Sequence, residues 1–133
     1  GPGYPKGTID LDASAEDNII SLAKAKGVKP SEITAILLDR PRHADKIEAI
    51  RKLGAAVSLI SDGDVAGVIH CAEARTGIDI YLGIGGAPEG VLSAAALRWV
   101  LSRPTATQCM RSLAGVITWT ISSPSQKQLP SLR

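Results

Sequence analysis

Short apolar runs that lack helical periodicity alternate along the chain with segments whose apolar residues recur every three or four positions. The first pattern is typical of a strand buried on both faces, and the second is typical of an amphipathic helix. We expect strands at residues 34–38, 55–60 and 78–82, and helices at residues 14–27, 42–53, 65–74 and 88–101. Strands separated by helices pair in parallel through right-handed crossovers. The sequence therefore predicts a layered α/β domain with mostly parallel strands.

The size of the chain suits one such domain. A chain of 133 residues can bury roughly two thirds of its unfolded surface, so a core can form without metals or disulfides. A composition of 44% hydrophobic and 21% charged residues excludes a disordered or fibrous chain. The core must be mainly aliphatic, because the sequence has no Phe and only two Tyr and two Trp.

The charges are distributed unevenly. Residues 1–97 hold ten basic and thirteen acidic residues, whereas residues 98–133 hold five basic residues and no acid. Five charges spread over so long a tail make a weak footprint for nucleic acid, so no nucleic-acid partner is expected. The apolar run at residues 113–121 is too short to cross a bilayer, and no signal peptide is expected at the start. Cys71 and Cys109 are too few for a disulfide framework, which is typical of a cytoplasmic protein without a membrane partner.

Three polar segments each follow a predicted strand directly. They occupy residues 39–43, residues 61–64 and residues 83–90. The carboxyl ends of parallel strands lie along one edge of a sheet, and α/β sheets bind ligands at that edge. We therefore expect residues that are remote in the sequence to meet there.

The first segment places Arg40 and Arg42 on either side of Pro41. Two guanidinium groups held at a fixed spacing suit the capture of phosphate oxygens, and the start of a helix adds partial positive charge. The alternative is a solvated turn whose arginines pair with neighbouring aspartates. We interpret His43 as a residue of the helix start rather than a catalytic base.

The second segment places Asp62 and Asp64 around Gly63. Two carboxylates there could bind sugar hydroxyls, orient a water molecule or assist a divalent cation. Asp-Gly is equally a common turn sequence, and Asp often caps a helix, so an ordinary turn is the alternative.

The third segment has four glycines in eight residues and includes Glu89, which lies at the start of a predicted helix. Such segments can cradle a phosphate with backbone N–H groups. The pattern matches neither a Walker A loop nor G-x-G-x-x-G with an acid about twenty residues later, which disfavours a nucleotide-binding Rossmann fragment. Glu89 is either a hard oxygen ligand for Mg²⁺ or Mn²⁺, or a carboxylate that pairs with the helix dipole.

The remaining reactive side chains lie on apolar segments. We expect His70 and Cys71 to be packing residues and Tyr81 to be part of the core. No Ser or Cys nucleophile with a plausible His partner stands out in the sequence.

Taken together, residues 38–43, 59–66 and 83–91, the spacings between them and the opening Gly-Pro-Gly-Tyr-Pro-Lys segment resemble the class II fructose-1,6-bisphosphatases. The resemblance runs from residue 1 to about Arg98. It implies the layered fold of the lithium-sensitive sugar phosphatases. It also implies hydrolysis of the 1-phosphate of fructose 1,6-bisphosphate to fructose 6-phosphate in gluconeogenesis, with Mn²⁺ or Mg²⁺ as cofactor. Some members of the family also accept sedoheptulose 1,7-bisphosphate, and the full-length family is expected to form homo-oligomers.

The resemblance also implies roles for individual residues. By position, the substrate-phosphate contacts are Arg40, Pro41 and Arg42, the sugar contacts are Asp62, Gly63 and Asp64, a further substrate contact is Gly86, and a metal ligand is Glu89.

On this resemblance, residues 1–98 are expected to be the C-terminal half of a sugar-bisphosphatase domain, and residues 99–133 a divergent basic tail that is either folded or poorly ordered. The family's other metal carboxylates and the groups that activate the attacking water then belong to an upstream half. The alternative function is a non-catalytic module that binds sugar phosphates or mediates oligomerisation.

Overall fold

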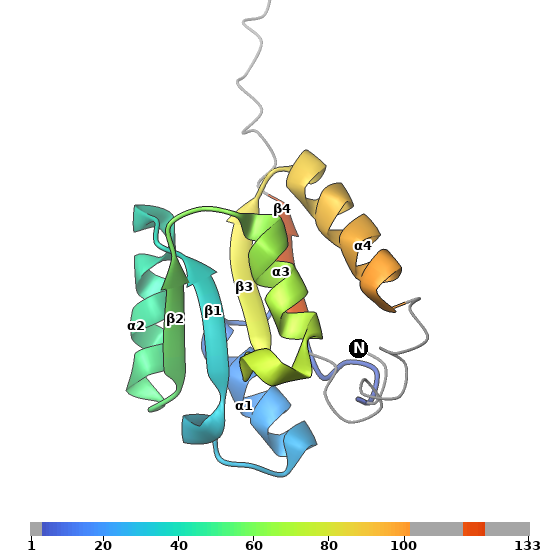
Figure 1. Cartoon of the computed structure of the whole chain (residues 1–133). Coiled ribbons are helices and arrows are strands. Elements are labelled where there is room, and N and C mark those ends of the chain that lie inside the picture. The colour runs from blue at the N-terminus through green and yellow to red at the C-terminus, as the bar shows by residue number, and fades with distance from the viewer. Residues whose placement is uncertain (1–3, 102–115, 122–133) are drawn as a thin grey trace, which may run out of the picture.

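A computed structural model describes residues 4–101 and 116–121 and shows an α/β domain built on one parallel sheet (Figure 1). The sheet contains β1 (Thr34–Leu38), β2 (Ala56–Ile60), β3 (Ile80–Gly85) and β4 (Val116–Ile121) in the spatial order β2-β1-β3-β4. All three neighbouring pairs are parallel. The predicted α/β class and parallel pairing are therefore confirmed.

The helices cover both faces of this sheet. Helices α1 (Ala15–Lys26) and α2 (Ala44–Lys52) pack on one face, and α3 (Asp64–Ala72) and α4 (Ala87–Leu101) lie together on the other (Figure 1). Short 3-10 turns span Pro30–Glu32, Pro41–His43 and Ala74–Thr76. All four predicted helices are present, and their observed ends lie within a few residues of the expected ones.

The caps of α1 illustrate why the helix ends were predictable. The Ser14 hydroxyl accepts a hydrogen bond from the Asp17 N–H at 3.0 Å, which satisfies one of the free donors at the start of the helix. Gly27 ends the helix in the left-handed region with φ of 71°, where a side chain would be strained.

Alternation of side chains along the central strands divides the core into two clusters. Leu37 and Leu82 face the cluster under α1 and α2, whereas Ile36 and Tyr81 face the cluster under α3. Both central strands are thus buried on both faces, as predicted for residues 34–38.

The expectation that residues 55–60 form a fully buried strand is wrong. Ala56 and Leu59 are exposed, and the other residues of β2 are half-buried. The reason is topological, because β2 lies at an edge of the sheet and pairs with β1 alone among the described strands.

The glycine-rich segment is shorter than predicted. Strand β3 continues through Gly85, and α4 begins at Ala87, so most of residues 83–90 have regular structure rather than forming a loop. The glycines of β3 pair with β4, in the register Gly83↔Trp119 and Gly85↔Ile121. Strand β4 was not predicted, and the other residues assigned to the tail beyond residue 101 lie outside the described part of the chain. No helix in residues 4–101 is long and apolar enough to span a membrane.

Candidate functional site

The three polar segments meet at the carboxyl edge of the sheet, as the parallel topology requires. At the end of β1, the Asp39 N–H donates to the Ile60 carbonyl at 2.8 Å, which joins the first segment to the end of β2. On the other side, the Arg42 Nε donates to the Ile84 carbonyl of β3 at 3.1 Å. The predicted convergence is therefore present, with the first segment between the other two.

His43 holds the first and third segments together. Its ring is fully buried, with Nδ1 2.9 Å from the Leu38 carbonyl, and Nε2 accepts a hydrogen bond from the Ile84 N–H at 3.1 Å. Because a carbonyl only accepts and an N–H only donates, this pair of contacts requires the neutral ring with its proton on Nδ1. His43 does precede α2, as predicted, but its role as a link between strand ends had no signal in the sequence.

The two arginines of the first segment differ in their contacts. Arg40 is half-buried, and its Nη1 donates to the Asp39 carbonyl at 3.1 Å. Arg42 is exposed and is held only through Nε. Neither arginine forms an ion pair within the described part of the chain. The alternative reading, in which these arginines pair with neighbouring aspartates, is therefore not what the structure shows.

The second segment combines a turn with an exposed carboxylate. Asp62 is exposed, and its Oδ1 accepts the Gly63 N–H at 2.8 Å. Gly63 has φ of 89° and directly precedes α3, so the reversal of the chain here needs glycine. Asp64 is the first residue of α3 and accepts a hydrogen bond from the Tyr81 hydroxyl. The backbone of this segment therefore forms a turn, which was the alternative interpretation. Asp62 and Asp64 nevertheless both lie at the sheet edge.

Tyr81 is the largest fully buried side chain among the described residues, which confirms it as a core residue. Burial raises the pKa of its phenol, and the hydrogen bond and negative charge of Asp64 raise it further. The phenol therefore stays protonated and acts as the donor in its contact with Asp64.

Gly86 and Glu89 lie together where β3 passes into α4. A Cβ added at Gly86 would lie 2.7 Å from the Glu89 Oε2, so the end of the Glu89 side chain lies directly over Gly86. Residues 4–101 contain no group of three or more His, Cys, Asp or Glu side chains that could hold a metal ion. Glu89 alone does not fit a Mg²⁺ or Mn²⁺ site, because such ions take several oxygen ligands.

His70 and Cys71 have different environments. Cys71 is buried as predicted, and burial, followed by the charge of Asp79, raises the pKa of its thiol to about 12. The expectation that His70 packs in the core is wrong, since its side chain is exposed near the end of α3. A helix buried along one stripe exposes the residue next to a buried one, and a single sequence does not reveal which residue that is.

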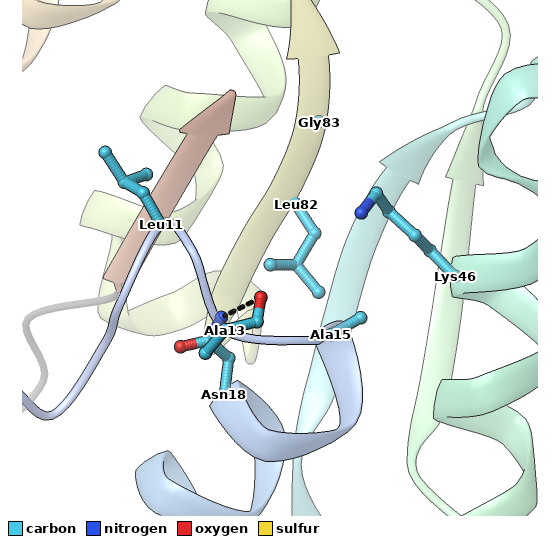
Figure 2. Close-up of a pocket in the computed structure, with 7 residues that line it drawn as sticks. All are labelled: Leu11, Ala13, Ala15, Asn18, Lys46, Leu82 and Gly83. Atoms are coloured by element: carbon cyan, nitrogen blue, oxygen red, sulfur yellow. Dashed lines mark hydrogen bonds between the residues drawn. The ribbon is translucent and has the colours of Figure 1, made fainter. Parts of the chain in front are cut away.

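A small pocket lies on the face of β3 that α1 and α2 cover, beside the start of α1 (Figure 2). Asn18 is bonded there to backbone groups of Asp10, at 2.9 Å through Oδ1 and 2.8 Å through Nδ2. The Lys46 side chain reaches toward Leu82 from α2 (Figure 2). None of the residues to which a substrate or metal contact was assigned lines this pocket, and Gly83 is its only lining residue from the three polar segments.

Comparison with known proteins identifies the family of this chain. The family described as bacterial fructose-1,6-bisphosphatase, glpX-encoded, matches residues 1–112, which extends beyond Arg98. Proteins named D-fructose 1,6-bisphosphatase class 2/sedoheptulose 1,7-bisphosphatase are 48% identical in Synechococcus sp. (strain CC9311) and 46% identical in Microcystis aeruginosa, each over 97 residues. Each alignment covers 73% of this chain, but the chain spans only 29% and 28% of the length of these two relatives. The chain belongs to the glpX-encoded bacterial fructose-1,6-bisphosphatase family.

Proposed function

We propose that this chain carries the sugar-bisphosphate-binding part of a fructose-1,6-bisphosphatase site. The observation that carries the proposal is the convergence of three polar strand-end segments, with Arg42 held across two of them. The relatives are named for fructose and sedoheptulose bisphosphates, which supports a sugar bisphosphate as the ligand. We extend the proposal to the layered sugar-phosphatase fold, to a cytoplasmic location and to homo-oligomers of the full-length protein.

The arginines supply the phosphate contact in this proposal. The bond from the Arg42 Nε to the Ile84 carbonyl fixes the plane of the guanidinium group and leaves both Nη groups for a ligand. A guanidinium group held in this way binds phosphate oxygens in pairs and loses little conformational entropy on binding. The half-buried Arg40 and the rigid, exposed Pro41 complete the segment beside the sheet edge.

The two remaining segments supply the sugar contacts. Carboxylate oxygens of Asp62 and Asp64 can accept hydrogen bonds from sugar hydroxyls. Gly86 has no side chain, so a ligand can approach the backbone closely at the start of α4. These three residues lie on both sides of the arginine segment, which suits a ligand that carries a phosphate next to several hydroxyls.

Metal binding enters the proposal through Glu89 alone. We assign Glu89 as one ligand of the family's Mn²⁺ or Mg²⁺ and place the other ligands outside this chain's described residues. When bound, such a metal would activate the attacking water and stabilise charge on the phosphate. Because the described residues do not provide the set of carboxylates that such a metal needs, a non-catalytic sugar-phosphate-binding module is the second candidate function.

The phosphate role of Arg42 is tested by binding. We expect Arg42→Ala to weaken the affinity of the purified chain for fructose 1,6-bisphosphate about tenfold, since it removes charged hydrogen bonds to phosphate. Isothermal titration calorimetry measures the change. Arg51→Ala, which removes an exposed arginine near the end of α2, is the matched control and should leave the affinity unchanged. Equal affinity of the Arg42→Ala and wild-type chains would refute this role.

Phosphate release tests whether the chain by itself hydrolyses fructose 1,6-bisphosphate. We expect the 133-residue chain with Mn²⁺ to release phosphate from fructose 1,6-bisphosphate no faster than its Glu89→Gln variant, because one carboxylate does not hold the ion. A colorimetric phosphate assay with and without a chelator makes the comparison. Turnover that needs Mn²⁺ and disappears in Glu89→Gln would instead show a complete site and would rule out the non-catalytic alternative.

A further inference from the structure

The Tyr81 side chain occupies a space that two glycines keep open. A Cβ added at Gly67 of α3 would lie 2.9 Å from the Tyr81 Cε2, and one added at Gly83 of β3 would lie 2.7 Å from the Tyr81 Cε1. Real Cβ atoms essentially never come this close to a neighbour, so the ring fits only because both positions lack a side chain. The ring is fully buried, and its position between α3 and β3 is set by packing on both sides.

This packing carries the phenolic hydroxyl to the carboxyl edge of the sheet. The hydroxyl lies against Gly83, where a Cβ would be 2.8 Å from it, and it donates to the Oδ1 of Asp64. A Phe or Leu side chain would serve the core of this cluster without needing a partner for a buried polar group. The hydroxyl is therefore explained by its contact with Asp64 rather than by the core.

The contact with Tyr81 uses one of the two oxygens of the Asp64 carboxylate. One carboxylate oxygen accepts from Tyr81, and the residue is half-buried at the start of α3. Within residues 4–101, no other side chain is seen to bond to this carboxylate. The second oxygen thus keeps its capacity to accept a hydrogen bond at the edge where Asp62 and the arginines lie.

We propose that Tyr81 is a positioning residue of the sugar-binding site, acting through Asp64. By occupying Oδ1, the phenol fixes the side-chain rotamer of Asp64 and presents Oδ2 to a sugar hydroxyl. The proposal rests on the proposed function, in which Asp64 contacts the sugar. Tyr81 itself stays buried and does not touch the ligand.

Binding measurements on a double-mutant cycle test the proposal. We expect Tyr81→Phe, which keeps the ring, to weaken the binding of fructose 1,6-bisphosphate to the full 133-residue chain about fivefold to tenfold. In the Asp64→Ala background the same change should have no further effect, because Tyr81 acts only through that carboxylate. Tyr4→Phe, which removes the hydroxyl of a half-buried tyrosine in the other core cluster, is the matched control and should not change the affinity. An equal loss of affinity in both backgrounds would mean that Tyr81 acts through packing, and would overturn the proposal.

A second measurement needs no ligand. NMR scalar couplings report the side-chain rotamer of Asp64, which should be single in the wild-type chain and averaged in Tyr81→Phe. An Asp64 side chain that stays fixed in Tyr81→Phe would overturn the positioning role. If the wild-type chain does not bind the sugar bisphosphate, the proposed function fails, and the rotamer measurement still decides whether Tyr81 positions Asp64.

Discussion

Replacing His43 with alanine is expected to lower the free energy of unfolding by about 3 kcal/mol. The imidazole ring is fully buried and bonded at both nitrogens, so its removal leaves a cavity and takes away the partner of one buried and one half-buried backbone group. Those groups, the Leu38 carbonyl and the Ile84 N–H, lie at the ends of the two central strands. The loss should therefore also loosen the edge of the sheet that carries the candidate site.

Urea denaturation followed by circular dichroism measures this loss. His70→Ala is the matched control, because His70 is the only other histidine and is exposed. Its effect should be within about 0.5 kcal/mol, as for most surface substitutions. Similar unfolding free energies for the two alanine variants would show that His43 does not link the strand ends.

Gly83→Ala is expected to cost about 2 kcal/mol of stability, although it adds a single methyl group. The methyl carbon would lie 2.7 Å from the Tyr81 Cε1 and 2.8 Å from its hydroxyl oxygen, and the fully buried ring could move away only by displacing its neighbours in the core. The φ angle of Gly83 is not in the left-handed region, so the cost is steric rather than conformational.

Removing the ring tests this explanation. In a Tyr81→Leu background, Gly83→Ala should cost less than about 0.5 kcal/mol, because the obstructing atoms are gone. The coupling is measured from the unfolding free energies of the two single variants and the double variant. If Gly83→Ala costs the same in both backgrounds, the strain arises elsewhere, and the packing account is incorrect.

Hydrophobic periodicity was sufficient to predict most of the fold. Residues 34–38 formed a buried strand as expected, and Ser14 and Gly27 marked the ends of α1 through local hydrogen bonding and backbone geometry. Strand β4 was missed because Thr118 interrupts its apolar run and its pairing partner lies more than thirty residues earlier in the chain. Without β4, the glycines of residues 83–85 had no strand to pair with and were read as a loop.

The candidate site was predictable at the level of segments but not of contacts. Parallel pairing requires the polar segments after β1, β2 and β3 to share one edge, and this requires only the order of the elements. The bond between His43 and Ile84 joins residues 41 positions apart, and the Tyr81 hydroxyl reaches Asp64 across 17 positions. Such contacts depend on distances between packed elements, which no local pattern encodes.

The packing around Tyr81 also limits the order in which these positions can change during evolution. A side chain gained at Gly67 or Gly83 meets the ring at once, whereas loss of the ring first would leave room for either gain. Substitutions at these three positions are therefore expected to be coupled, because a change that begins at either glycine strains the ring and a change that begins at the tyrosine removes that obstacle.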